Sequence, residues 1–187
     1  MITKFKMFEN KELFIVTSNP KKLKEYNDFG LSLKAKVGKD LPEVDSNIDD
    51  VITYKSLDAG INTIVEDTVL VVDGKEIVDI RWRIKEMNEN APATWIVSLG
   101  VNDGVKIKVY RGYINGMLVK KDDITGFGFD EYFVPYGTDL TLGELDRIGQ
   151  KPEYSARKMA VENLLEDNLY FDVNINDIKE WKGNYQH

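Results

Sequence analysis

Side chains suited to phosphate binding occur near the start of the sequence. The run Thr17-Ser18-Asn19 stands between an apolar segment and a helical pattern, and Lys22 follows within one turn. Small hydroxyls, free backbone N–H groups and the positive end of a helix dipole together bind anions. The run is not a Walker loop, because GxxxxGK(S/T) is absent. An ordinary Asn or Ser helix cap with a solvated lysine face accounts for the same residues and stays open as the alternative.

Acidic side chains suited to a divalent cation follow at Glu43 and at the pair Glu66-Asp67. Magnesium prefers oxygen ligands and keeps several waters, so one or two carboxylates beside substrate phosphates are enough to recruit it. The pair is expected at a strand end, where neighbouring side chains point to opposite faces. Asp67 then takes a proton from an attacking water or holds the metal, and Glu66 performs the other task. Solvated surface charge is the alternative for these acids.

The composition argues against several other kinds of site and partner. The sequence has no cysteine, and its only histidine is His187, so thiolate nucleophiles, zinc–sulfur sites and a catalytic histidine are not expected. The 25 basic and 32 acidic residues give a formal charge of −7, which disfavours nucleic-acid binding through a broad basic face. No apolar run approaches the ~18 residues of a spanning helix, and the first residues lack a secretory signal. We therefore expect a cytoplasmic protein without nucleic-acid or membrane partners.

Hydrophobic periodicity predicts the elements that must position these residues. In the first part of the chain, strands are predicted at 13–16 and 33–37 and helices at 21–29 and 48–59. Gly60 is expected to end the second helix. Strand segments at 63–65 and 69–72 flank the acidic pair, and Asp73-Gly74 indicates the turn of a hairpin. The phosphate-binding run is thus expected where a strand gives way to a helix.

A different set of elements is predicted in the second half. A short helix is predicted at 92–99, because Pro92 is typical of a first helical position. The segments 105–110 and 113–119 alternate as strands and are predicted to pair, with Asn115-Gly116 between apolar residues.

The last third is predicted to end in a helix and a polar tail. Residues 125–133 are expected to form an ordered loop that runs into a strand at Pro135, and 155–168 the last amphipathic helix. No structure is predicted for the tail from Leu169. Because no repeat or linker divides the chain and 42% of its residues are hydrophobic, we expect a single α/β domain over residues 1–187 with a mixed sheet.

These segments together resemble the inosine triphosphate pyrophosphatase family, from about Phe14 to Leu165. Five motifs occur in the family's order. Residues 17–25 look like the T-x-N-x-x-K-x-x-E signature, 41–43 like the acidic metal motif, 65–70 like V-E-D-S/T-x-L, 126–135 like G-F-G-(Y/W)-D-P-x-F-x-P, and 144–157 like the closing E-L…K-x-x-x-S-H-R. The resemblance implies an ITPase-like (Maf/ITPase superfamily) fold, an elongated mixed sheet flanked by helices with two lobes around a central cleft.

The resemblance also implies a role for each matched residue. Glu43, Asp67 and Glu66 are expected to hold Mg²⁺, and Asp67 also to accept the proton of the attacking water. Substrate contacts are expected from Thr17, Ser18, Asn19, Lys22, Lys55, Thr68, Phe127, Gly128, Phe129, Asp130, Lys151, Ser155 and Arg157. Of these, the residues from Phe127 to Asp130 belong to the base and sugar end. A homodimer is also implied.

Three departures from the family pattern bear on specificity. Ala156 replaces a histidine that, with Arg157, reads the 6-keto oxygen of the purine. Glu131 replaces a proline, and residues 78–90 do not match the family's segment at that place. We expect Mg²⁺-dependent hydrolysis of ITP, dITP or XTP to the monophosphate and pyrophosphate. Two alternatives stay open, namely the same reaction on a different modified or ordinary deoxynucleotide, and a non-catalytic nucleotide-binding protein.

Overall fold

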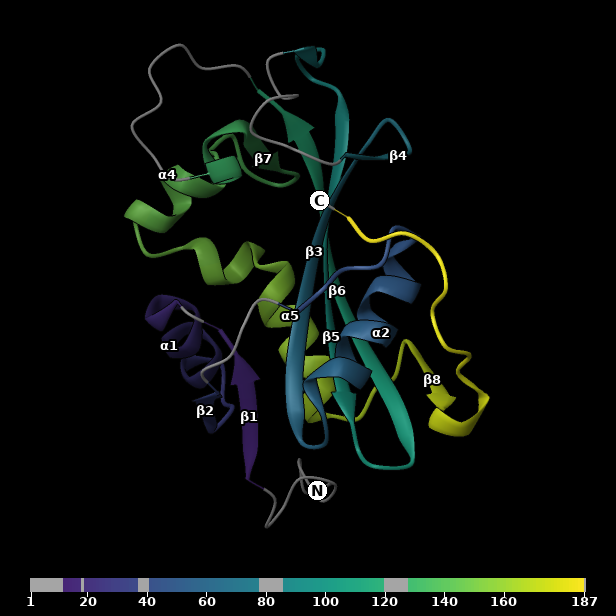
Figure 1. Cartoon of the computed structure of the whole chain (residues 1–187). Coiled ribbons are helices and arrows are strands. Elements are labelled where there is room, and N and C mark those ends of the chain that lie inside the picture. The colour runs from purple at the N-terminus through teal and green to yellow at the C-terminus, as the bar shows by residue number, and fades with distance from the viewer. Residues whose placement is uncertain (1–11, 18, 37–40, 78–85, 120–127, 187) are drawn as a thin grey trace. The chain divides into compact units, whose positions relative to one another are not determined.

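The computed structural model describes residues 12–17, 19–36, 41–77, 86–119 and 128–186 (Figure 1). Within these residues it is a mixed α/β structure around a sheet with strand order β2-β1-β3-β5-β6-β7, with β4 paired to β3 and β8 to β6. The strands are β1 (Leu13–Val16), β2 (Leu33–Lys36), β3 (Thr63–Val72), β4 (Lys75–Ile77), β5 (Pro92–Asn102), β6 (Lys106–Leu118), β7 (Phe133–Pro135) and β8 (Phe171–Asn174). The α-helices are α1 (Pro20–Asp28), α2 (Ile48–Ala59), α4 (Leu142–Arg147) and α5 (Ala156–Leu165). The predicted mixed α/β class is confirmed.

The chain divides into two compact units. The first unit comprises Met1–Asp67, Ser98–Gly112 and Lys158–His187, and the second comprises Thr68–Val97 and Tyr113–Arg157. Each unit has its own apolar core. None of the helices in the described ranges is long and apolar enough to cross a membrane.

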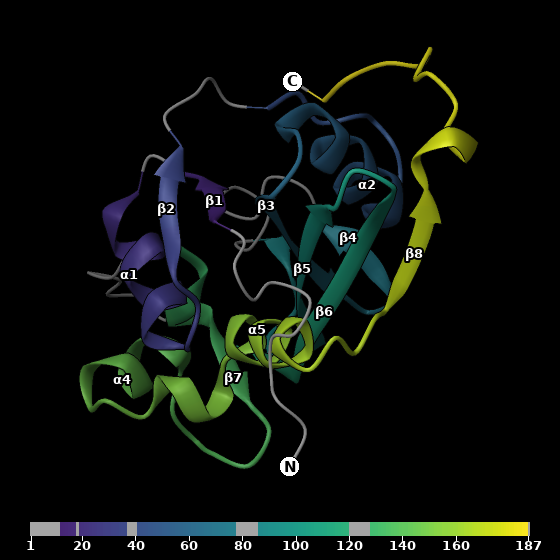
Figure 2. The same ribbon diagram turned by 90° about the horizontal axis from the view of Figure 1, so that it is seen from below.

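The first unit places the chain after β1 beside the acidic pair. β1 pairs in parallel with β3, so that Phe14 lies opposite Thr63 and Ile15 opposite Ile64. Continuing this register by two residues brings Thr17 level with Glu66. On its other edge β1 pairs in parallel with β2, and Figure 2 shows α1 beside these two strands. The end of β1, the start of α1 and the middle of β3 therefore meet at one place.

Local signals explain where the first two helices begin and end. Asn19 precedes α1 with its side chain accepting from the Lys21 N–H, and Pro20 occupies the first turn. Asn47 caps α2 in the same way, and α2 ends at Gly60, whose φ of 89° suits glycine. The predicted limits of the helix at 48–59 are confirmed, whereas α1 begins and ends one residue earlier than the predicted 21–29. The described parts of the predicted strands at 13–16 and 33–37 are confirmed, and the last helix is present but shorter than the predicted 155–168.

The core of the second unit forms around Phe133. β3 and β4 form the hairpin predicted at Asp73-Gly74, and β7 pairs with the second half of β6. The buried residues of this core come from five elements and one preceding loop position: Leu70, Val72, Ala91, Ala93, Leu118, Phe133, Leu142 and Leu145. The predicted loop before Pro135 is confirmed where it is described, as a 3₁₀ turn, η2 (Gly128–Tyr132), that runs into β7. Residues 125–127 lie outside the described residues.

The predicted helix at 92–99 is wrong, because this segment is the first part of the eleven-residue strand β5. Thr94, Trp95, Ile96 and Val97 are β-branched or aromatic, which favours a strand. From Val97 to Asn102 every residue is buried, so the alternation that marks a half-exposed strand is missing. Pro92, taken as a helix start, is instead the first residue of the strand.

The predicted strand pair at 105–119 is also wrong, because these residues form the single strand β6. The turn lies earlier, at Asp103-Gly104, where the Asp103 carboxylate accepts from the N–H groups of Val105 and Lys106. Asn115-Gly116 lies inside the strand. A Cβ at Gly116 would collide with the Val134 carbonyl and the Phe133 ring, so glycine permits the close approach of β7.

Two further expectations need correction. Glu66 and Asp67 are the fourth and fifth residues of the continuous strand β3, not residues at a strand end. The polar tail, for which no structure was predicted, contains β8, which pairs antiparallel with β6 from Lys106↔Asn174 to Val109↔Phe171. Alternating Phe171 and Val173 side chains pack against the core of the first unit, which explains why the tail is ordered.

Candidate phosphate and metal site

A pocket of about 510 Å³ opens where β1, α1, α2 and β3 of the first unit meet. Charged side chains from four different segments line it: Lys22 from α1, Glu43 from the segment before α2, Lys55 from α2 and Glu66 from β3. Its apolar wall consists of Ile15, Val16, Leu41, Pro42 and Val65, and Gln186 completes the lining. Two cations and two carboxylates thus converge on one cavity, from positions up to 44 residues apart.

Glu66 is held from the α1 side. The hydroxyl of Tyr26, a fully buried residue of α1, donates to the Glu66 carboxylate. The Lys22 ammonium lies 3.7 Å from the same oxygen, and the Glu66 side chain is only 6% exposed. Lys22 and Tyr26 are four residues apart and therefore share one face of α1. The resemblance did not point to Tyr26, whose only sequence signal was this spacing.

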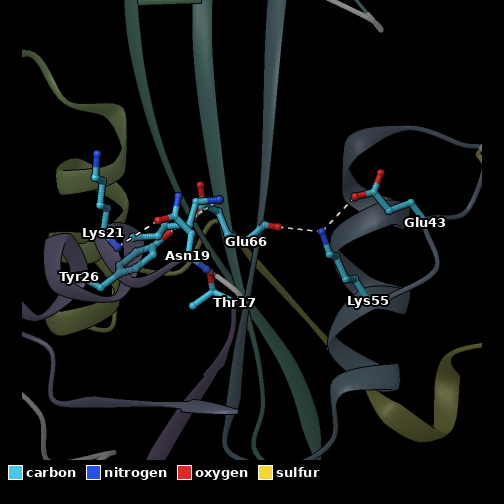
Figure 3. Close-up of polar contacts among 8 residues, drawn as sticks. Thr17, Asn19, Lys21, Tyr26, Glu43, Lys55 and Glu66 are labelled. Carbon is cyan, nitrogen blue, oxygen red and sulfur yellow. Dashed lines mark hydrogen bonds and ion pairs between the residues drawn. The ribbon is translucent and has the colours of Figure 1, made fainter. Parts of the chain in front are cut away.

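Lys55 links the two acidic segments. Its ammonium donates to the Glu43 carboxylate at 3.1 Å and to the Glu66 backbone carbonyl at 3.0 Å (Figure 3). The Lys55 side chain is mostly buried, and a buried cation interacts with anions more strongly than a solvated one. The lysine therefore stands between Glu43 and Glu66, in position to neutralise an oxyanion bound in the pocket.

The predicted phosphate-binding run is described at two of its three residues. The Asn19 side chain accepts from the Lys21 N–H at 3.0 Å, and the Asn19 N–H donates to the Thr17 hydroxyl at 3.1 Å (Figure 3). Asn19 therefore acts as the N-cap of α1, as the alternative interpretation of this run predicted. Ser18 lies outside the described residues. The phosphate contacts of this run stay a prediction.

The acids offer suitable oxygen donors for Mg²⁺. Glu43 and Glu66 line the pocket, whereas Asp67, the next residue along β3, is half-buried and is not among the described lining residues. In the part of the chain that the structure describes, no three acidic or histidine side chains form a cluster that would hold a metal alone. Mg²⁺ commonly takes one or two carboxylates and completes its shell with phosphate oxygens and water. The residues therefore fit a magnesium ion that arrives with a triphosphate.

The other predicted substrate-contact residues that the structure describes lie in the second unit. Asp130, in η2, accepts from the Lys151 ammonium at 2.7 Å, so two of them are brought together. Thr68 on β3 and Ser155 and Arg157 at the start of α5 are half-buried. Gly128 and Phe129 begin η2, while Phe127 and residues 78–85 lie outside the described residues. The substrate contacts of this set stay a prediction.

Glu131, where the family has proline, anchors the segment that carries Asp130. Its carboxylate is buried and receives two hydrogen bonds from the Arg147 guanidinium, at 2.5 and 3.3 Å. These hydrogen bonds raise the pKa of Arg147. A Cβ at Gly143 would collide with the Glu131 carboxylate, so glycine in α4 makes room for it. An ion pair therefore replaces the backbone restriction of proline.

This anchor gives a stability prediction. Arg147→Met leaves a buried carboxylate without its donor, and the midpoint of thermal unfolding should fall by about 3–6 °C. The double variant Glu131→Leu, Arg147→Met should lose less, because no unpaired charge remains. Asp146→Asn, at an exposed neighbour, is the matched control and should unfold as the unmodified protein does. Equal melting of all four proteins would show that the pair is only a surface contact.

The chain is similar to several known proteins. A family model described as the Ham1 family matches residues 75–167. The chain is 25% identical over 181 residues to a dITP/XTP pyrophosphatase of Hyperthermus butylicus, covering 83% of this chain and 94% of that protein. It is 26% identical to an inosine triphosphate pyrophosphatase of Encephalitozoon cuniculi, covering 81% and 91%.

A shorter match and a solved structure extend the comparison. A dITP/XTP pyrophosphatase of Aliarcobacter butzleri is 36% identical over 74 residues, which span 39% of this chain and 37% of that protein. The structure of the Staphylococcus aureus Ham1 protein superposes with a TM-score of 0.61 over 84% of this chain and 97% of that one, at 22% identity. At that identity the superposition shows a shared fold.

Proposed function

Because the chain belongs to the inosine triphosphate pyrophosphatase family, we propose that it hydrolyses triphosphates of non-standard purines, such as ITP, dITP and XTP, to the monophosphate and pyrophosphate. The observation that carries the proposal is the convergence of Lys22 and Lys55 with Glu43 and Glu66 on one cavity. A cavity with both signs of charge suits a triphosphate together with a cation, because the lysines attract the phosphates and the carboxylates attract the cation.

The proposed reaction is in-line attack of water on the α-phosphorus, with pyrophosphate as the leaving group. The protein has little covalent work in such a transfer, so positioning and charge neutralisation dominate. Lys22 and Lys55 bind the anionic oxygens, and Asp67 takes the proton of the attacking water. Glu43, Glu66 and Asp67 would hold Mg²⁺ beside the phosphates, and the bound ion would supply electrostatic stabilisation of the phosphate oxygens.

Ala156 supports a second candidate, the same reaction on another base. Ala156 is 2% exposed, and its methyl group offers no hydrogen bond to a purine keto oxygen. A hydrogen bond to a substrate group gives strong selectivity, because its loss leaves a polar partner unpaired. The base preference therefore has to come from elsewhere in the chain or is relaxed.

A substrate panel tests both candidates. The purified protein is mixed with Mg²⁺ and ITP, dITP, XTP or the ordinary nucleotides, and pyrophosphate and orthophosphate are measured separately. Pyrophosphate release from the non-standard purines supports the first candidate, whereas faster release from another nucleotide supports the second. Orthophosphate as the product contradicts the proposed reaction, and binding of a nucleotide without turnover favours a non-catalytic binding protein.

Two lysines of α1 form a matched pair for a further prediction. Lys22 faces Glu66 and the pocket, while Lys24 is exposed and pairs with Asp28 on its own helix. Lys22→Ala should lower kcat/KM about 10- to 100-fold, since a hydrogen bond to a charged group contributes about 1.5–3 kcal/mol. Lys24→Ala should leave it within twofold, because exposed pairs contribute little. Equal losses in the two variants would mean that the pocket does not bind the phosphates.

Family membership also supports the remaining parts of the proposal. We propose that Mg²⁺ is the metal, that the protein acts in the cytoplasm without nucleic-acid or membrane partners, and that residues 1–187 act as one domain and assemble as a homodimer. Sedimentation velocity checks the assembly, with an expected mass of twice 21.4 kDa. Sedimentation at the monomer mass in the active preparation would contradict it.

A further inference from the structure

The last residues of the chain run along α2 to the segment that carries Glu43. Figures 1 and 2 show this C-terminal stretch passing beside α2 after β8. We call residues 179–186 the C-terminal strap. The strap belongs to the same compact unit as the pocket, and the family model that matches the chain ends before it, at residue 167.

An aromatic contact fastens the beginning of the strap to α2. The Tyr54 hydroxyl donates to the Lys179 carbonyl at 2.6 Å. The Tyr54 ring packs against Trp181 with the ring centroids 5.4 Å apart, and the Trp181 indole N–H donates to the Asn184 carbonyl at 3.0 Å. Because Tyr54 directly precedes Lys55 in α2, the strap is fastened next to the lysine of the pocket.

The end of the strap binds three consecutive residues of the acidic segment. The Gln186 N–H donates to the Glu43 carbonyl at 2.8 Å, and the Gln186 side-chain amide donates to the Val44 carbonyl at 3.0 Å. The Asp45 N–H donates to the Asn184 carbonyl at 2.9 Å. Tyr185 and Val44 form an antiparallel β-bridge. The backbone from the Glu43 carbonyl to Asp45 is therefore tied to the strap.

These contacts join two elements whose side chains must meet. The Glu43 carboxylate reaches Lys55 on α2, and the strap connects α2 through Trp181 to the Glu43 backbone through Gln186. A site held in advance binds more tightly, because less conformational freedom is lost on binding, and small displacements of positioned groups cost much activity. Gln186 also lines the pocket itself.

We propose that the C-terminal strap positions Glu43 for the divalent cation and the triphosphate, with Gln186 as the positioning residue. The inference rests on the proposed function for the identity of the ligands. The new element of the inference is that the affinity of the Glu43 site is set by a distant segment, whose Gln186 lies 142 positions after Val44 in the chain. The strap residues do not take part in bond breaking.

The test compares Gln186→Ala with the unmodified protein in three measurements. Hydrogen–deuterium exchange of the amides in residues 41–46 should become about tenfold faster, because the hydrogen bonds between this segment and the C-terminal strap are weakened. The second measurement is the binding of Mn²⁺ to the protein in the presence of inorganic pyrophosphate, followed by electron paramagnetic resonance. In Gln186→Ala this binding should be about tenfold weaker. The Mg²⁺ concentration for half-maximal hydrolysis should rise about tenfold, whereas kcat at saturating Mg²⁺ should change less than twofold.

Two further variants separate positioning from general loss of structure. Trp181→Ala, which removes the anchor, should reproduce all three changes, and Lys182→Ala, at an exposed strap residue, should produce none. Thermal melts check that every variant is folded.

The outcomes for the strap and for the reaction are distinguishable. If exchange at 41–46 and Mn²⁺ binding are the same in Gln186→Ala and the unmodified protein, the strap inference is wrong whatever the activity. If the unmodified protein turns over no nucleotide, the proposed reaction is wrong, and the exchange and Mn²⁺ measurements still decide the role of the strap.

Discussion

Asp67→Asn is expected to lower kcat by about 10²- to 10⁴-fold, the usual contribution of a general base. The Glu66 carboxylate already accepts from Tyr26 and lies beside Lys22, so it is less available than Asp67 to take a proton from water. Asp67, the next residue of β3, is the acid that the family resemblance assigns to the water. Asparagine has nearly the same shape but does not take a proton from water at neutral pH. Pyrophosphate release under single-turnover conditions measures the effect on the chemical step.

Two matched variants accompany this measurement. Asp73→Asn removes an acid at the hairpin turn after the same strand, where φ is 50° and asparagine is tolerated, so activity should be unchanged. Glu66→Gln should mainly raise KM and the Mg²⁺ requirement. A larger fall in kcat for Glu66→Gln than for Asp67→Asn would indicate that Glu66 is the general base, and would contradict our assignment of that role to Asp67.

Lys55→Met is expected to lower kcat/KM about 10²- to 10³-fold, which is the effect of removing one donor that stabilises developing charge. Lys55 is the cation that contacts both the Glu43 carboxylate and the Glu66 carbonyl. Methionine keeps the length and apolar stem of the side chain while removing its charge, so packing against α2 is largely preserved. Steady-state kinetics with the best nucleotide of the panel measure the loss.

The conservative variant distinguishes charge from geometry. Lys55→Arg keeps the charge but replaces a compact ammonium by a planar guanidinium. Its kcat/KM should therefore lie between those of Lys55→Met and the unmodified protein. Because Lys55 also holds Glu43, the Mg²⁺ requirement of Lys55→Met should rise together with KM. Unchanged kcat/KM and Mg²⁺ dependence in Lys55→Met would show that Lys55 has no role in binding the substrate or the metal.

Local features of the sequence were sufficient for the elements that end in strong caps. The helix at 48–59 was predicted with its observed limits, because Asn47, the first-turn acids and Gly60 act within a few residues of its ends. The strand at 13–16 and the junction with α1 followed from the same kind of signal. The failures occurred at β5 and β6, where burial on both faces hides the strand period and Gly116 serves packing rather than a turn.

The sequence by itself determined which residues are able to do the chemistry. Lys22, Glu43, Lys55 and the acidic pair were all proposed from residue type and motif. Only the tertiary structure decided how the two lysines, Glu43 and Glu66 meet. The parallel register of β1 and β3 brings α1 to Glu66, and the Tyr26 hydroxyl and the Lys22 ammonium both lie at this carboxylate.

The C-terminal strap was decided by tertiary structure alone. The Gln186 side chain donates a hydrogen bond to Val44, which lies 142 positions earlier in the chain. No residue spacing or helix cap near either segment predicts that contact. Propensities, caps and periodicity reflect interactions over a few residues, whereas strand register and the docking of a tail depend on which distant surfaces become buried together.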